Sequence, residues 1–281
     1  MRKTIAFIGV GNMASAIIGG ITSRTSKPIK WSDIILYNRH REKIEGYQIK
    51  GARIADTLEE AVKAADCVLL CIKPQNFNEI LPLLSSIEDV EKKLFISIAA
   101  GITSDAISSA ANNAAVVRVM PNTPMLIGKG VSAISRNSLV NDSDFEFACE
   151  IFSSAGSVVT IDEDEMNKII CVTGSSPAYI FMVIKAMYDS AVDQGLISDN
   201  EGSGLSSKAL TDAICDTIIG AATLMKLSDK TPEEQIQAVC SKGGTTERAV
   251  ASLEEYKLYE AFSVAMKKCT ERADELGMLN K

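Results

Sequence analysis

The residues with the clearest chemical potential lie near the start of the chain. An apolar run at residues 4–8, long enough for a strand, is followed by Gly9, Gly11 and Ala14 in the spacing G-x-G-x-x-A. The first glycine allows a tight turn, the second lets a diphosphate approach the backbone, and the alanine lets a helix pack closely on the strand. The following helix start adds free N–H groups and a positive dipole end. The pattern predicts a dinucleotide site, and a glycine turn that binds nothing is the alternative. The residues predicted to line it are Ile8, Gly9, Val10, Gly11, Asn12 and Met13.

The end of the second strand-like run indicates which dinucleotide binds. Residues 33–37 form this run, and Asn38 and Arg39 follow it. An acid here would bond the ribose 2′-hydroxyl and repel a 2′-phosphate. The chain has no acid there, and an arginine can clamp a phosphate with two hydrogen bonds. The sequence therefore favours NADP(H), with NAD(H) left open; a solvated loop is the alternative.

Three later loops follow the strand-like runs 67–72, 94–98 and 116–120. Ligands of open parallel sheets bind beyond the carboxyl ends of the strands. We therefore expect these loops to border the ribose and the nicotinamide. The residues predicted to contact the cofactor there are Ile72, Lys73, Pro74, Ala99, Ala100, Gly101 and Asn122.

Two motifs of small residues in the second half of the chain are candidates for a substrate site. At 241–248, two glycines and two threonines open a helix, where N–H groups, hydroxyls and the helix dipole suit a small carboxylate. At 174–177, Gly-Ser-Ser-Pro forms a turn that could face the nicotinamide. A glycine turn with a threonine cap and a capped helix start are the structural alternatives. The predicted substrate residues are Ser241, Gly243, Gly244, Thr245, Thr246, Ser175 and Ser176.

The elements that must position these motifs change in type along the chain. The first half alternates strand-like and helical runs, and two further strands are expected at 131–134 and 157–161. This alternation is typical of an α/β fold with a doubly wound parallel sheet. After Asp162 helical periods take over, so we expect a Rossmann-type domain over 1–161 and an all-helical domain over 162–281. Helices that are apolar on more than one side favour a homo-oligomer. We expect its contacts in residues 200–281; a monomeric bundle is the alternative.

Composition opposes several classes of function. The chain has 281 residues and a net charge of −7, which gives no support for binding nucleic acid. We expect no membrane association, because no apolar stretch reaches the roughly 18 residues of a membrane span. The first strand begins by residue 4, which leaves no room for a signal peptide. Seven cysteines without C-x-x-C spacing predict reduced thiols, a cytoplasmic protein and no metal site. With His40 as the one histidine, chemistry must use hydroxyls, N–H groups, carboxylates or lysines.

Together these motifs are similar, in order and spacing, to those of one family. The chain resembles pyrroline-5-carboxylate reductase over essentially its whole length. The resemblance implies an NADP-dependent oxidoreductase that reduces 1-pyrroline-5-carboxylate to L-proline with NAD(P)H, the last step of proline biosynthesis. It also implies a Rossmann domain joined to a helical dimerisation domain, with dimers able to form rings. The likeness rests on residues 8–14, 38–39, 72–74, 99–102, 120–124, 174–179 and 243–246.

The resemblance assigns roles within the second glycine motif. Thr246, as the catalytic residue, bonds the ring nitrogen, while Ser241 and the N–H groups of Gly244, Thr245 and Thr246 hold the carboxylate. A protonated cyclic imine accepts a hydride without a protein nucleophile, so the protein must align the reactants and supply a proton or hydrogen bond.

Two residues depart from the family's usual motifs. Ser176 stands where the family has glycine and adds a side chain near the expected substrate pocket. Lys242 stands where the family has proline and adds a positive charge near the carboxylate.

Two other functions remain open from the residues alone. A β-hydroxyacid dehydrogenase would need a lysine and an asparagine about one helical turn apart soon after the glycine turn. Residues 174–187 contain Lys185 and no asparagine. A non-catalytic NADP-binding sensor would combine intact cofactor loops with a pocket blocked at Ser176.

Overall fold

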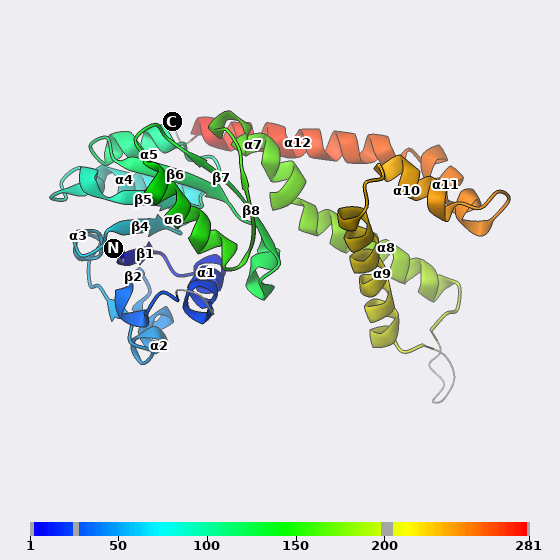
Figure 1. The fold of residues 1–281 in the computed structure, drawn as a ribbon, viewed down its shortest axis with the longest axis horizontal. Coiled ribbons are helices and arrows are strands. Elements are labelled where there is room, and N and C mark those ends of the chain that lie inside the picture. The colour runs from blue at the N-terminus through cyan, green and yellow to red at the C-terminus, as the bar shows by residue number, and fades with distance from the viewer. Residues whose placement is uncertain (1–2, 25–27, 198–204, 280–281) are drawn as a thin grey trace. The chain divides into compact units, whose positions relative to one another are not determined.

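The computed structural model describes residues 3–24, 28–197 and 205–279 (Figure 1). Its contacts divide the chain into two compact units. Unit 1 comprises Met1–Pro177 and Lys267–Lys281, and unit 2 comprises Ala178–Met266. This division falls after Pro177, and the domain boundary expected after residue 161 stays a prediction.

Unit 1 is built on one eight-stranded sheet with the order β3-β2-β1-β4-β5-β6-β7-β8. Neighbouring strands are parallel except for β6 and β7. Only residues 121–129 join these two strands, whereas a parallel crossover needs about a dozen residues or more, so the chain reverses there. The predicted doubly wound sheet is confirmed, with this one antiparallel pair as the difference. The strands are β1 (Ile5–Ile8), β2 (Ile34–Tyr37), β3 (Arg53–Ile54), β4 (Cys67–Leu70), β5 (Leu94–Ser97), β6 (Ala115–Met120), β7 (Gly130–Arg136) and β8 (Gly156–Thr160).

Helices cover both faces of this sheet, because successive strand residues point to opposite sides. Phe7 belongs to a buried cluster that includes Ile17 of α1 and Phe152 of α6. The next residue, Ile8, belongs to a second cluster that includes Phe77 of α4 and residues of α3 and α5. The strand order reverses between β1 and β4, where open α/β sheets form ligand sites. The helices of this part are α1 (Asn12–Ser23), α2 (Glu45–Gln48), α3 (Leu58–Lys63), α4 (Phe77–Leu84), α5 (Ser104–Ala110) and α6 (Asp142–Ser153).

The rest of the described chain is helical. Its elements are α7 (Met166–Ile169), a π-helical turn (Ile170–Gly174), α8 (Ser176–Asp193), α9 (Ser207–Leu227), α10 (Pro232–Val239), α11 (Thr245–Glu255) and α12 (Leu258–Leu279). Residues 200–204 and 280–281 of the predicted oligomer contact region lie outside the described residues.

A helical run, Glu163–Asp193, passes through the place where the sequence predicted a turn. Pro177 has no N–H group, so inside a helix it leaves the carbonyl oxygen four residues earlier without its usual donor. That oxygen belongs to Thr173, and the side-chain amide of Asn122 donates a hydrogen bond to it at 3.0 Å. A distant side chain thus replaces the missing donor. Ser176 begins α8, so these residues open a helix, which was the structural alternative to the turn, and their predicted place facing the nicotinamide stays a prediction.

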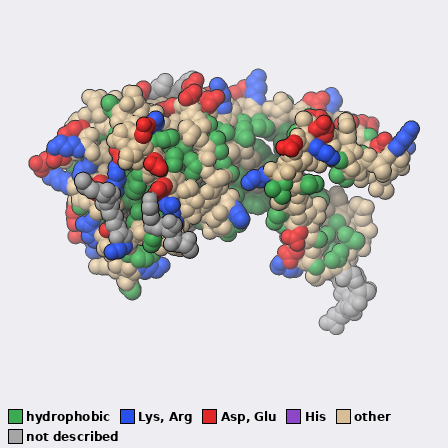
Figure 2. All heavy atoms as spheres, in the orientation of Figure 1, with side chains coloured by type: hydrophobic (Ala, Val, Ile, Leu, Met, Phe, Trp, Pro, Cys, Tyr) green, Lys and Arg blue, Asp and Glu red, His purple; other side chains and the backbone are tan. Residues whose placement is uncertain are grey.

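Large apolar side chains remain exposed on the helices of unit 2. The described helices α8, α10 and α11 contain no buried residue. Phe181 is 64% exposed and Met182 is 71% exposed, and Figure 2 shows hydrophobic side chains at the surface of these helices. By length and composition alone, the run Glu163–Asp193 is also long and apolar enough to cross a membrane. The expectation that no apolar stretch reaches that length is therefore wrong.

Candidate functional site

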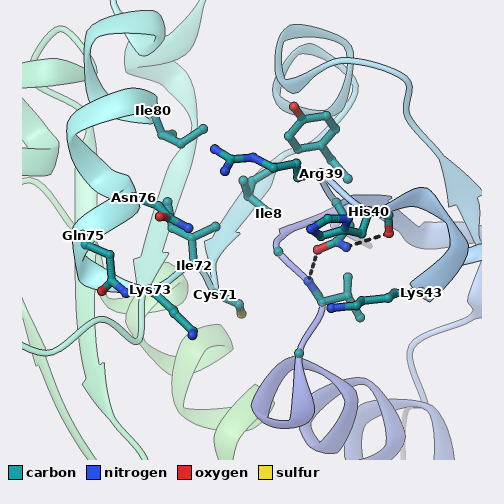
Figure 3. Close-up of a pocket in the computed structure, with 15 residues that line it drawn as sticks. Ile8, Arg39, His40, Lys43, Cys71, Ile72, Lys73, Gln75, Asn76 and Ile80 are labelled. Carbon is teal, nitrogen blue, oxygen red and sulfur yellow. Dashed lines mark hydrogen bonds between the residues drawn. The ribbon is translucent and has the colours of Figure 1, made fainter.

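A cavity of about 450 Å³ lies at the ends of β1, β2 and β4 in unit 1 (Figure 3). It occupies the point at which the strand order reverses. The glycine loop after β1, the loop after β2 and the segment that leads into α4 form its walls. Of the predicted cofactor residues, those that line it are Ile8, Gly9, Val10, Gly11, Asn38, Arg39, Ile72 and Lys73.

Glycine suits positions 9 and 11 of the loop for different structural reasons. Gly9 has a φ of +86°, and its N–H group donates to the carbonyl oxygen of Tyr37 at 2.8 Å. A Cβ atom on Gly9 would lie 2.8 Å from Cγ2 of Ile72. Gly11 is the N-cap of α1, has no side-chain cap, and would place a Cβ atom in open space. The free N–H groups at this helix start and the space in front of Gly11 fit a diphosphate.

Asn38 holds the glycine loop against the end of β2. Its Oδ1 atom accepts a hydrogen bond from the N–H group of Val10 at 3.0 Å, and its Nδ2 atom donates to the carbonyl oxygen of His40 at 2.8 Å (dashed lines in Figure 3). The side chain thereby fixes the shape of the cradle. Its predicted contact with the cofactor stays a prediction.

Positive side chains surround the cavity. Arg39, Lys43 and Lys73 line it, and the two lysines extend into it from opposite walls (Figure 3). Sequence reasoning missed Lys43, although it ends the basic stretch that begins at Arg39. Arg39 donates a hydrogen bond to the carboxylate of Glu79 on α4. This charge suits the phosphates of a dinucleotide.

The remaining predicted cofactor residues do not line this cavity. Asn12 and Met13 begin α1, and Pro74 begins the short 3₁₀ turn before α4. Gly101, after β5, has a φ of +74° and packs so closely on α12 that a Cβ atom would lie 3.1 Å from the backbone nitrogen of Gly277. Contacts of this group with a cofactor stay predictions; its members are Asn12, Met13, Pro74, Ala99, Ala100, Gly101 and Asn122.

Glu163 holds the start of α5, a role that sequence reasoning missed. Its carboxylate accepts hydrogen bonds from the N–H group of Ser104 at 2.7 Å and from the Ser104 hydroxyl. It also lies 3.5 Å from the guanidinium of Arg118, whose side chain is 4% exposed. Burial lowers the pKa of Arg118, and the Glu163 carboxylate opposes that change. Glu163 therefore steadies the loop that follows β5 and balances a buried charge.

The second glycine motif opens α11 in unit 2. Gly244 is its N-cap and has no side-chain cap. The N–H group of Gly244 donates to the carbonyl oxygen of Ser241 at 2.8 Å, so it is already engaged. The N–H groups of Thr245 and Thr246 stand in the first helical turn, where intrahelical partners are missing. These groups and the Thr246 hydroxyl can meet a small anion.

Charged residues of both signs lie next to this motif, so some would attract a bound carboxylate and one would repel it. Glu247, which sequence reasoning did not single out, accepts a hydrogen bond from the N–H group of Gly243 at 2.6 Å. Lys242 and Arg248 add positive charge beside it. A carboxylate bound by the N–H groups of Thr245 and Thr246 would therefore also be repelled by the nearby Glu247 carboxylate.

The other predicted substrate residues, Ser175 and Ser176, belong to unit 1. Ser176 begins α8, and the Ser175 hydroxyl lies 3.2 Å from the Cys269 thiol. Among the described residues, no group of three His, Cys, Asp or Glu side chains is arranged to hold a metal ion.

Comparison with known proteins gives the family. Residues 163–276 match the family model "Pyrroline-5-carboxylate reductase dimerisation", and residues 4–101 match "NADP oxidoreductase coenzyme F420-dependent". The chain is 34% identical to a pyrroline-5-carboxylate reductase of Corynebacterium melassecola over 98% of both chains. A solved pyrroline-5-carboxylate reductase of Coxiella burnetii is 30% identical, with a TM-score of 0.86 over 98% of this chain and 99% of that one. The pyrroline carboxylate reductase of Plasmodium falciparum, solved with NADP bound, is 26% identical, with a TM-score of 0.85 over 98% of both. This chain belongs to the pyrroline-5-carboxylate reductase family.

Proposed function

We propose that this chain reduces 1-pyrroline-5-carboxylate to L-proline in the cytoplasm, with NADPH as the preferred hydride donor. The observation that supports this best is the open cradle at Gly11, which faces a cavity lined by Arg39, Lys43 and Lys73. Family membership supports the reaction itself and the use of NAD(P)H.

The cavity in unit 1 fits the cofactor in three ways. The N–H groups at the start of α1 meet the diphosphate, for which Gly11 leaves space. The lysines at 43 and 73 balance its charge, and Arg39 takes the 2′-phosphate. When bound, NAD(P)H supplies the hydride.

The start of α11 fits the imine. In its first turn, the N–H groups of Thr245 and Thr246 hold the substrate carboxylate. The Thr246 hydroxyl donates a hydrogen bond to the nitrogen of the neutral ring imine; as the hydride adds to the ring carbon, the hydroxyl proton passes to nitrogen, and water returns a proton to the Thr246 oxygen. Ser176 sits at the start of α8 and narrows the range of imines accepted.

The exposed apolar helices support assembly of this chain with itself. The run Glu163–Asp193 contains an apolar window of which only 6% is buried, and large exposed apolar surfaces mark interaction sites. A family model for dimerisation covers all of this run, which favours a partner subunit over a lipid bilayer. We therefore place the contacts in the described parts of 200–281 and in this run, and we extend the proposal to rings of dimers.

A steady-state assay of the full-length protein with 1-pyrroline-5-carboxylate and NADPH tests the reaction. Thr246→Ala should keep NADPH binding and lower kcat by about tenfold to a hundredfold or more, because a positioned proton donor is lost. Thr246→Ser should retain most activity, since the hydroxyl remains.

Two outcomes would contradict the proposal. If Thr246→Ala only lowers the melting temperature, the residue is a helix cap worth about 1 kcal/mol. If the protein binds NADPH but reduces no imine, it is a binding module.

A further inference from the structure

Arg39, the residue proposed to receive the 2′-phosphate, already has an anionic partner. Its guanidinium donates a hydrogen bond to Glu79, and the two side chains are 64% and 59% exposed. Glu79 lies on α4 directly before Ile80, which lines the cavity. Figure 3 shows Arg39 extending toward Ile80, so the ion pair stands at the edge of the cavity.

A phosphate monoester and Glu79 require the same group on Arg39. The phosphate carries about −1.5 to −2 charges at neutral pH. It must displace the carboxylate to gain the guanidinium, and it then has a negative neighbour on α4. A ribose with a free 2′-hydroxyl meets neither penalty, because it brings no charge to Arg39.

We propose that Glu79 is a specificity-determining residue that competes with the 2′-phosphate of NADPH for Arg39. It thereby narrows the preference for NADPH over NADH. The inference rests on the proposed placement of the 2′-phosphate at Arg39. In many such folds an acid at the end of β2 selects NAD(H). In this chain the acid that disfavours NADPH is Glu79, which lies on α4 instead.

The other charges near Arg39 do not compete in the same way. His40 lies 3.5 Å from Glu42, and both are on the same loop. Arg41 pairs with Asp56, and neither lines the cavity. Those two side chains are 54% and 70% exposed, so this ion pair matches the Arg39 pair in exposure and serves as its control.

The test measures Kd of the full-length protein for NADPH and for NADH. Glu79→Gln should tighten NADPH binding by about threefold to tenfold, the range expected for one exposed ion pair plus one like-charge contact. NADH binding should stay within about twofold, and the gain for NADPH should shrink at high salt. Asp56→Asn should change neither constant.

A second variant separates this inference from the cofactor placement. Arg39→Ala should weaken NADPH binding, and Glu79→Gln in that background should give a smaller gain than in the wild type. If Arg39→Ala weakens NADPH binding but Glu79→Gln alters both cofactors equally, or neither, the role of Glu79 is refuted. If Arg39→Ala leaves NADPH binding unchanged, the placement of the 2′-phosphate is wrong, and the role of Glu79 fails with it.

Discussion

Replacing each glycine of the first loop by alanine separates the fold from cofactor binding. Gly11 has space for a Cβ atom within the protein, with no heavy atom within 4 Å, but it lines the cavity. Gly9 has a left-handed backbone, and its Cβ atom would approach Cγ2 of Ile72 at 2.8 Å and the carbonyl oxygen of Cys71 at 3.1 Å. Gly11→Ala should therefore impair binding, and Gly9→Ala should impair folding.

The local structure at each glycine gives the expected size of the change in stability and in NADPH Kd. At Gly11, alanine is a poorer N-cap but reduces the entropy of the unfolded chain, so the free energy of unfolding should change by less than about 1 kcal/mol. The new methyl group stands where the diphosphate must approach, and NADPH Kd should rise by about tenfold to a hundredfold. At Gly9, the left-handed conformation costs about 1–2 kcal/mol and the contact with Ile72 about 1–3 kcal/mol. The expected loss of stability is about 2–5 kcal/mol.

Denaturant unfolding and NADPH titration, run on both variants and the wild type, test this reasoning. We expect Gly11→Ala to have wild-type stability but to bind NADPH poorly, and Gly9→Ala to be unstable. Wild-type binding by Gly11→Ala would show that the diphosphate does not approach this loop. Wild-type stability of Gly9→Ala would show that the loop can relax at no cost, contrary to the close contacts of its backbone.

Two further predictions concern stability and assembly. Glu163→Ala should lower the free energy of unfolding by about 2–4 kcal/mol, because it removes the carboxylate that balances the buried Arg118 charge and removes hydrogen bonds from Ser104. Glu163→Gln should lose less, since its amide oxygen can still accept from the Ser104 N–H group; equal stability of Glu163→Ala and wild type in denaturant would contradict this role. In detergent-free sedimentation at micromolar concentration the chain should run as a dimer or a multiple of dimers, and a stable single chain would contradict the proposed assembly.

The glycine loop could be predicted from sequence because its causes are local. A tight turn, a close approach to the backbone and a helix start each depend on residues within a few positions of one another. The central strands β1, β4 and β5 could be predicted for the same reason, since their apolar runs are continuous and buried along their whole length. The reversal at β7 depends on the length of the connection after β6, a weaker signal, and was missed.

Residues that act through distant partners could not be found in this way. Glu79 meets Arg39 only because α4 follows the strand next to β1 in the sheet. Glu163 meets Arg118 and Ser104 only after folding, and no spacing in the sequence relates the three. Tertiary placement decides these contacts, so motif reasoning predicts the cavity and its cations Arg39 and Lys73 but not the acidic partners Glu79 and Glu163.

The two asparagines show how such placement changes a residue's role. Asn38 and Asn122 follow strands in the sequence, and both were predicted to face the cofactor. In the structure Asn38 holds the loop after β1. Asn122 accepts a hydrogen bond from the N–H group of Val131 at 2.8 Å while donating to Thr173, so both its oxygen and its amide nitrogen are engaged. A short amide side chain at a strand end reaches the neighbouring backbone first, and buried backbone groups need partners whether or not a ligand is bound.

The groups at the cavity therefore fall into those that hold the backbone and those that remain for the cofactor. Asn38 fixes the backbone of the glycine loop, and we propose that the N–H groups at the start of α1 and the long cations Arg39, Lys43 and Lys73 contact the dinucleotide. In that proposal the N–H groups at the start of α1 meet the diphosphate that both cofactors share. The cations lie on exposed, flexible stems, and one of them is shared with Glu79. On the proposed placement, discrimination between NADPH and NADH rests on the balance of charge at the rim of the cavity, while the shape of the glycine loop determines whether either one binds.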